Sequence, residues 1–256
     1  MGNDIDGKVF GDITEEYDRF RPEYCSGLTE AIFACSGIGE GSVILEIGIG
    51  TGKATVPFLE AGCNVDAVDI SENMIEFCRE KFAGYKNLFL MTADFAVFDT
   101  PRRYDLIYSA TAFHWIPSEI SYMKALSLLR PGGTLAVFRN YPAAGESGSS
   151  VDQKIQAAYE AVRGPSGPRP SALDRMRSSE IEMSAHGFRD VVSQMFYSQR
   201  KMTASDYIGV MRTYSDHIAS PPDERVQLEE KVFDAIESEG GMITVYDSQA
   251  LVMGHK

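Results

Sequence analysis

The ten residues Val43–Gly52, VILEIGIGTG, carry the clearest chemical signal in this chain. An apolar run typical of a short buried strand includes Glu46 and leads into Gly48, Gly50 and Gly52. Glycines at alternate positions predict a sharp turn where the backbone comes close to a ligand. A helix expected over residues 53–60 would direct its N-terminal N–H groups at that ligand, as in α/β proteins that bind nucleotides.

The spacing of the glycines discriminates between nucleotide ligands. The dinucleotide fingerprint is G-x-G-x-x-G/A, and from Gly48 its last position falls on Lys53, which is neither glycine nor alanine. The pattern in this chain is instead E-x-G-x-G-x-G. The spacing therefore disfavours an NAD-dependent oxidoreductase, which we keep as a less favoured alternative.

An acidic residue ends the next expected strand. Residues Asn64–Asp69 alternate as a strand does, and Asp69 lies 21 positions after Gly48. In a βαβ unit this position brings a carboxylate to the ribose hydroxyls, and a carboxylate accepts hydrogen bonds from both hydroxyls of a diol. Ser71 is expected to cap a following helix that contains Met74.

A second acid ends the strand expected over Leu88–Asp94. Asp94 and Phe95 together suit an adenine site, with a carboxylate for the amino group and an aromatic side chain for the ring. Three further elements complete this half of the chain: a strand over Tyr104–Ser109, a helix over Ser121–Arg130 that stops at a Pro-Gly-Gly turn, and a strand over Thr134–Phe138.

In order and spacing these blocks resemble the class I methyltransferases that use S-adenosylmethionine, most clearly over about residues 40–140. The resemblance implies an α/β fold with a Rossmann-like, seven-stranded, mostly parallel sheet and an antiparallel last strand. It also implies a helical cap formed by the N-terminus and insertions. The cofactor-binding residues that it implies are Glu46, Gly48, Gly50, Gly52, Asp69, Ile70, Met74, Asp94, Phe95 and Ser109.

Two further segments narrow the resemblance. TAFHW at Thr111–Trp115 and YDRFRP at Tyr17–Pro22 are similar to the trans-aconitate methyltransferase-like enzymes, which act on small molecules. Residues Tyr246–Met253 resemble the final strand of the same fold. The methyl acceptor implied by this likeness is a small molecule, whose identity the sequence leaves open.

Five residues are candidates for the acceptor side of the reaction. His114 follows the fourth strand, at the sheet edge where α/β proteins bind ligands, and could act as a general base, as a hydrogen-bond donor, or only as a support for its loop. Arg21 and Arg139 could bind a carboxylate of the acceptor or of the cofactor, or pair with surface acids. Trp115 could form a wall of the acceptor pocket or belong to the core, and Tyr17 could line the pocket or only pack within the cap.

The rest of the chain is interpreted as part of one methyltransferase domain over residues 1–256, with cap segments at about 1–30, 141–177 and 203–238. Loops are expected over 141–150 and 164–170, helices over 151–162, 178–186, 204–214 and 223–237, and strands over 190–201 and 242–253.

Composition excludes several classes of protein. The net charge of −13 disfavours binding to nucleic acids and anionic membranes. The chain has no apolar run of about 18 residues, so no membrane span is expected. The first residues lack the basic-then-apolar pattern expected of a signal peptide, and Asp6 stands where an N-myristoylation motif needs Ser or Thr. Its four cysteines and four histidines show no metal-ligand spacing. We expect a cytoplasmic enzyme without a metal, whose oligomeric state is open.

The predicted function is S-adenosylmethionine-dependent methyl transfer to a small molecule, at a carboxylate or a phenol oxygen. A carboxylate needs no base because it is already ionised at neutral pH, whereas a phenol needs one. The alternatives are a protein that binds S-adenosylmethionine without catalysis and, less favoured, the oxidoreductase.

Overall fold

The computed structural model describes residues 11–167 and 169–256. These divide into two compact units, the first from the described parts of residues 1–22, 141–170 and 197–248, the second from residues 23–140, 171–196 and 249–256. Residues 1–10, which include the rejected myristoylation motif and the beginning of the predicted cap segment 1–30, lie outside the described residues. A capping role for the three segments stays a prediction.

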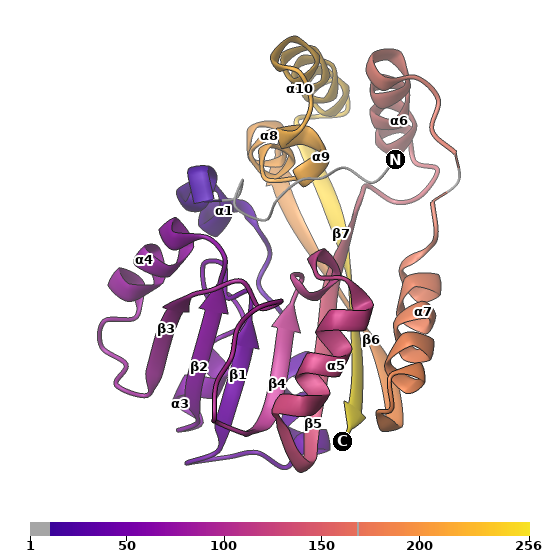
Figure 1. The fold of residues 1–256 in the computed structure, drawn as a ribbon. Helices are drawn as coiled ribbons and strands as arrows, with labels where there is room; N and C mark the ends of the chain where they lie inside the picture. The colour runs from indigo at the N-terminus through magenta and orange to yellow at the C-terminus, as the bar shows by residue number, and fades with distance from the viewer. Residues whose placement is uncertain (1–10, 168) are drawn as a thin grey trace. The chain divides into compact units, whose positions relative to one another are not determined.

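A seven-stranded sheet in the order β3-β2-β1-β4-β5-β7-β6 organises the chain. Strands β1 to β5 pair in parallel, whereas β7 points the opposite way from β4 in Figure 1. This confirms the predicted fold class. The strands are β1 (Val43–Ile47), β2 (Asn64–Asp69), β3 (Leu88–Thr92), β4 (Tyr104–Ala110), β5 (Leu129–Ala144), β6 (Arg189–Thr203) and β7 (Met242–His255).

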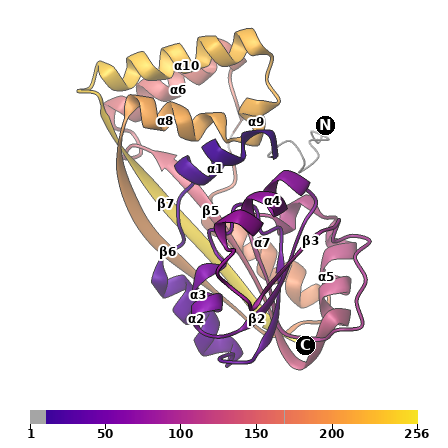
Figure 2. The same cartoon turned by 90° about the vertical axis from the view of Figure 1, so that its left-hand side faces the viewer.

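Helices cover both faces of the sheet in the second unit. Figure 2 shows α2 and α3 on one side of the sheet and α5 on the other. The helices of this unit are α2 (Ser26–Ser36), α3 (Val56–Glu60), α4 (Glu72–Lys81), α5 (Ser118–Leu128) and α7 (Ala172–Ala185). A 3₁₀ turn, η2 (Phe113–Trp115), follows β4.

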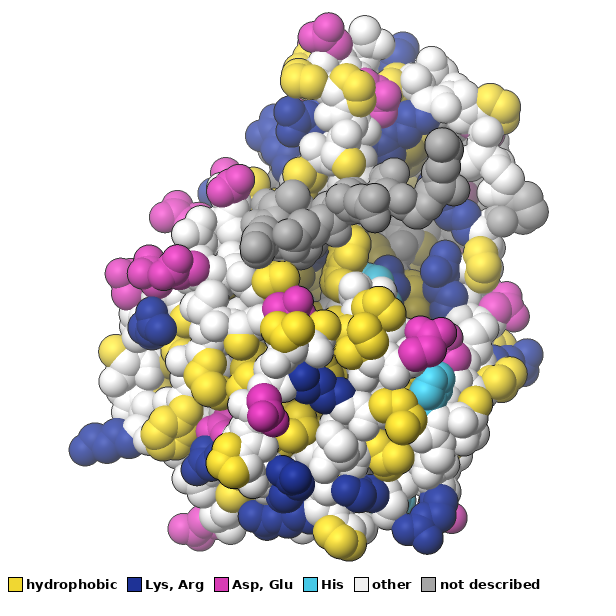
Figure 3. Space-filling view, viewed as in Figure 1, with side chains coloured by type: hydrophobic (Ala, Val, Ile, Leu, Met, Phe, Trp, Pro, Cys, Tyr) yellow, Lys and Arg dark blue, Asp and Glu magenta, His cyan; other side chains and the backbone are white. Residues whose placement is uncertain are grey.

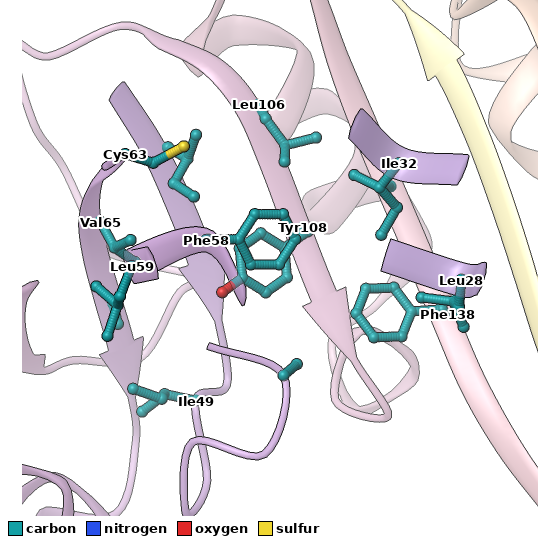
Figure 4. Packing of buried hydrophobic residues seen from close by; sticks show 14 of the residues in the cluster. Leu28, Ile32, Ile49, Phe58, Leu59, Cys63, Val65, Leu106, Tyr108 and Phe138 are labelled. Atoms are coloured by element: carbon teal, nitrogen blue, oxygen red, sulfur yellow. The ribbon is translucent and has the colours of Figure 1, made fainter. Parts of the chain in front are cut away.

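In the second unit β1, β2 and β4 are buried along nearly their whole length, because helices cover both of their faces. In Figure 4 the ring of Phe58 from α3 lies over Tyr108 from β4, with a centroid distance of 4.4 Å. Leu28 and Ile32 of α2 complete this layer, and both are buried. Met74, Ile75 and Cys78 of α4 are buried as well.

The first unit consists of α1 (Thr14–Phe20), α6 (Ser150–Arg163), α8 (Ala204–Arg212), α9 (Ser215–Ile218) and α10 (Pro222–Glu237), with residues 141–144, 197–203 and 242–248 of the long strands. Leu228, Val232 and Ile236 of α10 are fully buried, as their spacing on one helical face predicts. They pack with side chains of α6 and α8 in a separate apolar cluster.

Several predicted boundaries were wrong. β5 begins directly after α5 and continues to Ala144, so residues 141–144 pair in the sheet instead of forming the predicted loop. α7 starts at Ala172, not at residue 178, because Ser171 and Asp174 form a capping box. α3 starts at Val56, not at residue 53, and the predicted helix over 204–214 ends at Arg212.

Candidate cofactor and acceptor site

The register of β1 and β2 brings the glycine turn to the acid at the end of β2. Ile47 pairs with Val68, and the amide of Gly48 donates to the carbonyl of Val68 at 2.8 Å. Asp69, the next residue of β2, therefore lies beside the turn. The glycine turn and Asp69 are distant in sequence but close in space, because β1 and β2 are parallel and end at the same edge of the sheet.

Asp69 accepts a hydrogen bond at each carboxylate oxygen. The amide of Gly50 donates to Oδ2 and the amide of Ser71 to Oδ1, both at 2.9 Å. Burial raises the pKa of Asp69, and the backbone N–H groups oppose that shift by favouring the charged form. The backbone amide of Ile70 favours the charged form as well. A carboxylate has about four lone-pair sites, so these backbone donors do not saturate it.

The glycines meet different surroundings. Gly48, Gly50 and Gly52 have φ of 72°, 54° and 75°, in the left-handed region that side chains disfavour. A Cβ on Gly48 would lie 2.3 Å from the Cβ of Ala112, so protein atoms fill that space. A Cβ on Gly50 would meet no protein atom within 4 Å. Gly50 thus borders open space, as a backbone cradle for a cofactor requires.

Glu46 supports the glycine turn from within the core. Its side chain is fully buried, and Oε2 accepts hydrogen bonds from Thr55 Oγ1 at 2.8 Å and Tyr108 Oη at 2.7 Å. Burial raises the pKa of Glu46 to about 8, although the two hydroxyl donors favour the charged form. These contacts attach the start of α3 to β1 and β4, and the predicted cofactor contact of Glu46 stays a prediction.

The remaining cofactor candidates differ in accessibility. Ser109 is buried and donates to the carbonyl of Ile47 at 2.8 Å, which uses its hydroxyl within the sheet. Phe95 is only 3% exposed, which leaves little of its ring for an adenine. Asp94 is exposed and Ile70 half-buried, whereas Met74 is buried in α4. The most accessible of these candidates are therefore Asp94 and Ile70.

His114 and Trp115 lie on the turn η2, at the carboxyl end of β4. His114 is exposed, yet the protein atoms crowded around it lower the pKa of its imidazole, and the positive charges of Arg139 and Arg175 lower it further, to about 3. The ring is therefore neutral at physiological pH. Its neighbour Trp115 is 37% exposed.

Because its positive charge acts on His114, Arg175 is a candidate residue that the sequence analysis missed. It lies on α7, in a stretch that was predicted to precede the helix, and 61 positions separate it from His114. Only the packing of α7 reveals its charge near η2. On the face of the molecule that Figure 3 draws, acidic and basic side chains are interspersed.

Tyr17 and Arg21 belong to the first unit, whereas all other predicted site residues belong to the second. The guanidinium of Arg21 lies 5.1 Å from the ring centroid of Tyr17 and 4.9 Å from that of Tyr214. One terminal nitrogen donates to the carbonyl of Thr213. Among the described residues, Nε of Arg21 has no hydrogen-bond partner.

The described part of the chain contains no group of three or more His, Cys, Asp or Glu side chains that could hold a metal ion. Within the same residues no helix has the length and apolar character that a membrane crossing requires. The four cysteines are free thiols, two of them buried.

Comparison with known proteins points to one enzyme class. Residues 44–133 match the family described as a methyltransferase domain. An uncharacterized methyltransferase of Schizosaccharomyces pombe is 24% identical over 91% of this chain and 88% of its own length. A malonyl-[acyl-carrier protein] O-methyltransferase of Ilyobacter polytropus is 36% identical over 36% of this chain and 37% of its own length. Several other curated relatives are matched over only about half of their length.

Solved structures agree on the fold. A putative type II methyltransferase from Anaeromyxobacter dehalogenans superposes with a TM-score of 0.67 at 17% identity, over 92% of this chain and 98% of that one. A methyltransferase from Geobacter sulfurreducens in complex with S-adenosylhomocysteine superposes with a TM-score of 0.54 at 15% identity. The superposition covers 97% of this chain and 98% of that one. Together these findings support a class I methyltransferase that uses S-adenosylmethionine, and they do not single out the trans-aconitate subgroup.

Proposed function

We propose that this S-adenosylmethionine-dependent methyltransferase methylates an ionised oxygen, most simply a carboxylate, of a small-molecule acceptor. The observation that carries the proposal is that the positive charges of Arg139 and Arg175 act on His114, which lies on the turn after β4. In a chain with a net charge of −13, two guanidinium charges that act on one exposed candidate residue favour an anionic ligand.

The neutral imidazole of His114 supports the same class of acceptor. A ring with a pKa of about 3 is a weak base at neutral pH, so it is poorly suited to deprotonate a phenol. It can still donate one N–H and accept at its other nitrogen, which suits a hydrogen bond to an acceptor oxygen. A carboxylate needs no deprotonation, because it is already ionised.

The residues of the second unit would divide the work of binding and alignment. When bound, S-adenosylmethionine supplies an electrophilic methyl group, which forms a bond to the acceptor oxygen while the carbon–sulfur bond breaks and sulfur keeps the electron pair. Asp69 would hold the ribose, and the backbone at Gly50 would border the cofactor. Arg139 and Arg175 would orient the acceptor oxygen, so that alignment supplies much of the acceleration.

An acceptor acid would also agree with the likeness to trans-aconitate methyltransferase-like enzymes and with the O-methyltransferase names of several relatives.

The test is a screen with methyl-labelled S-adenosylmethionine against small mono-, di- and tricarboxylates, phenols and amines. We expect base-labile methyl esters from one or more acids. Arg139→Met and Arg175→Met should each raise the KM for that acid by about 10- to 100-fold, since a hydrogen bond to a charged group is lost. Arg177→Met, an exposed substitution on the same helix, is the control.

Two outcomes would overturn this proposal. Turnover of phenols, amines, nucleic acids or proteins, but of no acid, would assign a different acceptor. Binding of S-adenosylmethionine without turnover of any acceptor would favour the non-catalytic alternative.

A further inference from the structure

Thr111, the first residue after β4, has a backbone conformation that its residue type disfavours. Its φ is 59°, and among the described non-glycine residues only Asp190 shares a positive φ. Asp adopts the left-handed region with modest cost, whereas a β-branched residue there is a real outlier. Glycine would adopt it without strain. The side chain of Thr111 makes a contact that glycine could not provide.

That contact is a hydrogen bond between two hydroxyl groups. Oγ1 of Thr111 lies 2.7 Å from the phenol oxygen of Tyr24, and the amide of Thr111 donates to the carbonyl of Phe138 at 2.8 Å. The ring of Tyr24 meets Phe138 edge-on, with a centroid distance of 4.8 Å. Thr111 thereby connects the end of β4 to β5 and to the segment that precedes α2.

The residues that follow Thr111 are those whose placement matters to the site. Ala112 occupies the space that Gly48 leaves free, because a Cβ on Gly48 would lie 2.3 Å from that of Ala112. The turn η2 with His114 and Trp115 begins one residue later. A left-handed residue at position 111 therefore sets both the contact with the glycine turn and the direction in which η2 leaves the sheet.

We propose that the hydroxyl pair Tyr24–Thr111 is a positioning device that holds the turn η2 in register with the glycine turn. Both are positioning residues, because they act through His114 and the glycine turn. The catalytic consequence rests on the proposed function, whereas the structural consequence does not.

Trp115 provides a direct readout of the turn, because it is the only tryptophan of the chain and is 37% exposed. The variants are Thr111→Gly, Tyr24→Phe and Thr111→Ser, with the exposed Tyr197→Phe as control. We expect Thr111→Gly and Tyr24→Phe to shift the Trp115 emission to the red and to increase its quenching by acrylamide. Thr111→Ser, which keeps the hydroxyl, and the control should behave as wild type.

A second measurement separates positioning from general damage to the fold. With an acceptor from the screen, Tyr24→Phe and Thr111→Gly should lower kcat by about tenfold, while the Kd for S-adenosylmethionine changes by less than about threefold, because alignment is lost and cofactor contacts are kept. Thr111→Ser should restore kcat.

The positioning role would be overturned if Tyr24→Phe and Thr111→Gly fold and the quenching of Trp115 is unchanged in both. It would also be overturned if Thr111→Ser behaves like Thr111→Gly. If Thr111→Gly does not fold, Tyr24→Phe alone decides. If the screen finds no acceptor, that result counts against the proposed function only. The fluorescence measurement then still decides whether Tyr24 and Thr111 position the turn η2.

Discussion

The amide of Gly50 donates a 2.9 Å hydrogen bond to Oδ2 of Asp69, which joins the glycine turn after β1 to the carboxylate that ends β2. The two residues lie 19 positions apart in the chain. This hydrogen bond connects the glycine turn directly to the acid that is expected to bind ribose. We therefore expect a substitution at either residue to change the conformation at the other.

Asp69→Ala should weaken the binding of S-adenosylmethionine by roughly 1.5–3 kcal/mol, since a charged acceptor of two hydroxyl hydrogen bonds is lost. Isothermal titration gives the dissociation constant, and urea unfolding reports any loss of stability caused by the orphaned amides of Gly50 and Ser71. Exposed Asp99→Ala is the control. An unchanged dissociation constant in Asp69→Ala would place the ribose elsewhere.

Gly50→Val should abolish binding of S-adenosylmethionine and leave the protein folded. The φ of 54° disfavours a β-branched side chain, but no protein atom lies within 4 Å of the added Cβ. The side chain would instead enter the space where we expect the cofactor to bind. Gly84→Val, at a glycine with ordinary φ and equally open surroundings, should bind normally. Retained affinity in Gly50→Val would mean that the turn is only structural.

The wild-type protein should bind S-adenosylmethionine and S-adenosylhomocysteine with micromolar affinity, about 8 kcal/mol, and should not bind NAD. The E-x-G-x-G-x-G spacing and Asp69 are the reasons for this preference. Isothermal titration of each of the three ligands into the same protein preparation measures this preference. Tight binding of NAD with no response to S-adenosylmethionine would contradict both the site and the proposed function.

Glu46 should make stability fall as the pH rises from about 6 to 9. The folded protein keeps the carboxyl protonated up to a pKa of about 8, whereas the unfolded chain has released that proton above its ordinary pKa of 4.5. The stability that this retained proton contributes is fully present below the pKa of the unfolded chain. It is lost as the pH rises through the pKa of the folded protein.

Glu46→Gln removes this titration and serves as the comparison. Between pH 6 and pH 9 the wild type should lose about 2–3 kcal/mol of unfolding free energy relative to Glu46→Gln. Urea denaturation of both proteins at the two pH values measures the difference. Parallel pH dependence in the two proteins would show that Glu46 is ionised in the fold.

His114→Ala should lower turnover of a carboxylate acceptor only modestly, because no proton has to be removed. The pH profile of the wild type should be flat between pH 5 and 9, since the pKa of His114 lies near 3. A loss of about 100-fold or more in His114→Ala, with a shifted pH profile, would instead identify the imidazole as a general base. The measurement is the initial rate of methyl transfer across that pH range.

The sequence by itself determined the elements whose signals are local. The apolar runs, the glycines at 48, 50 and 52, and the cap at Ser71 are patterns within a few residues, and they predicted β1, β2 and the start of α4 closely. Asp69 was found in the same way, because the distance from a glycine turn to the acid of the next strand is nearly constant in a βαβ unit.

Only the tertiary structure decided the features that depend on contacts between distant segments. It buried Phe95 and Ser109, surrounded Glu46 with Thr55 and Tyr108, and brought Arg175 near His114. The strain at Thr111 is likewise invisible in the sequence, because a threonine carries no local sign of a positive φ. Burial and electrostatic neighbours are properties of packing, and packing joins residues whose separation along the chain follows no fixed spacing.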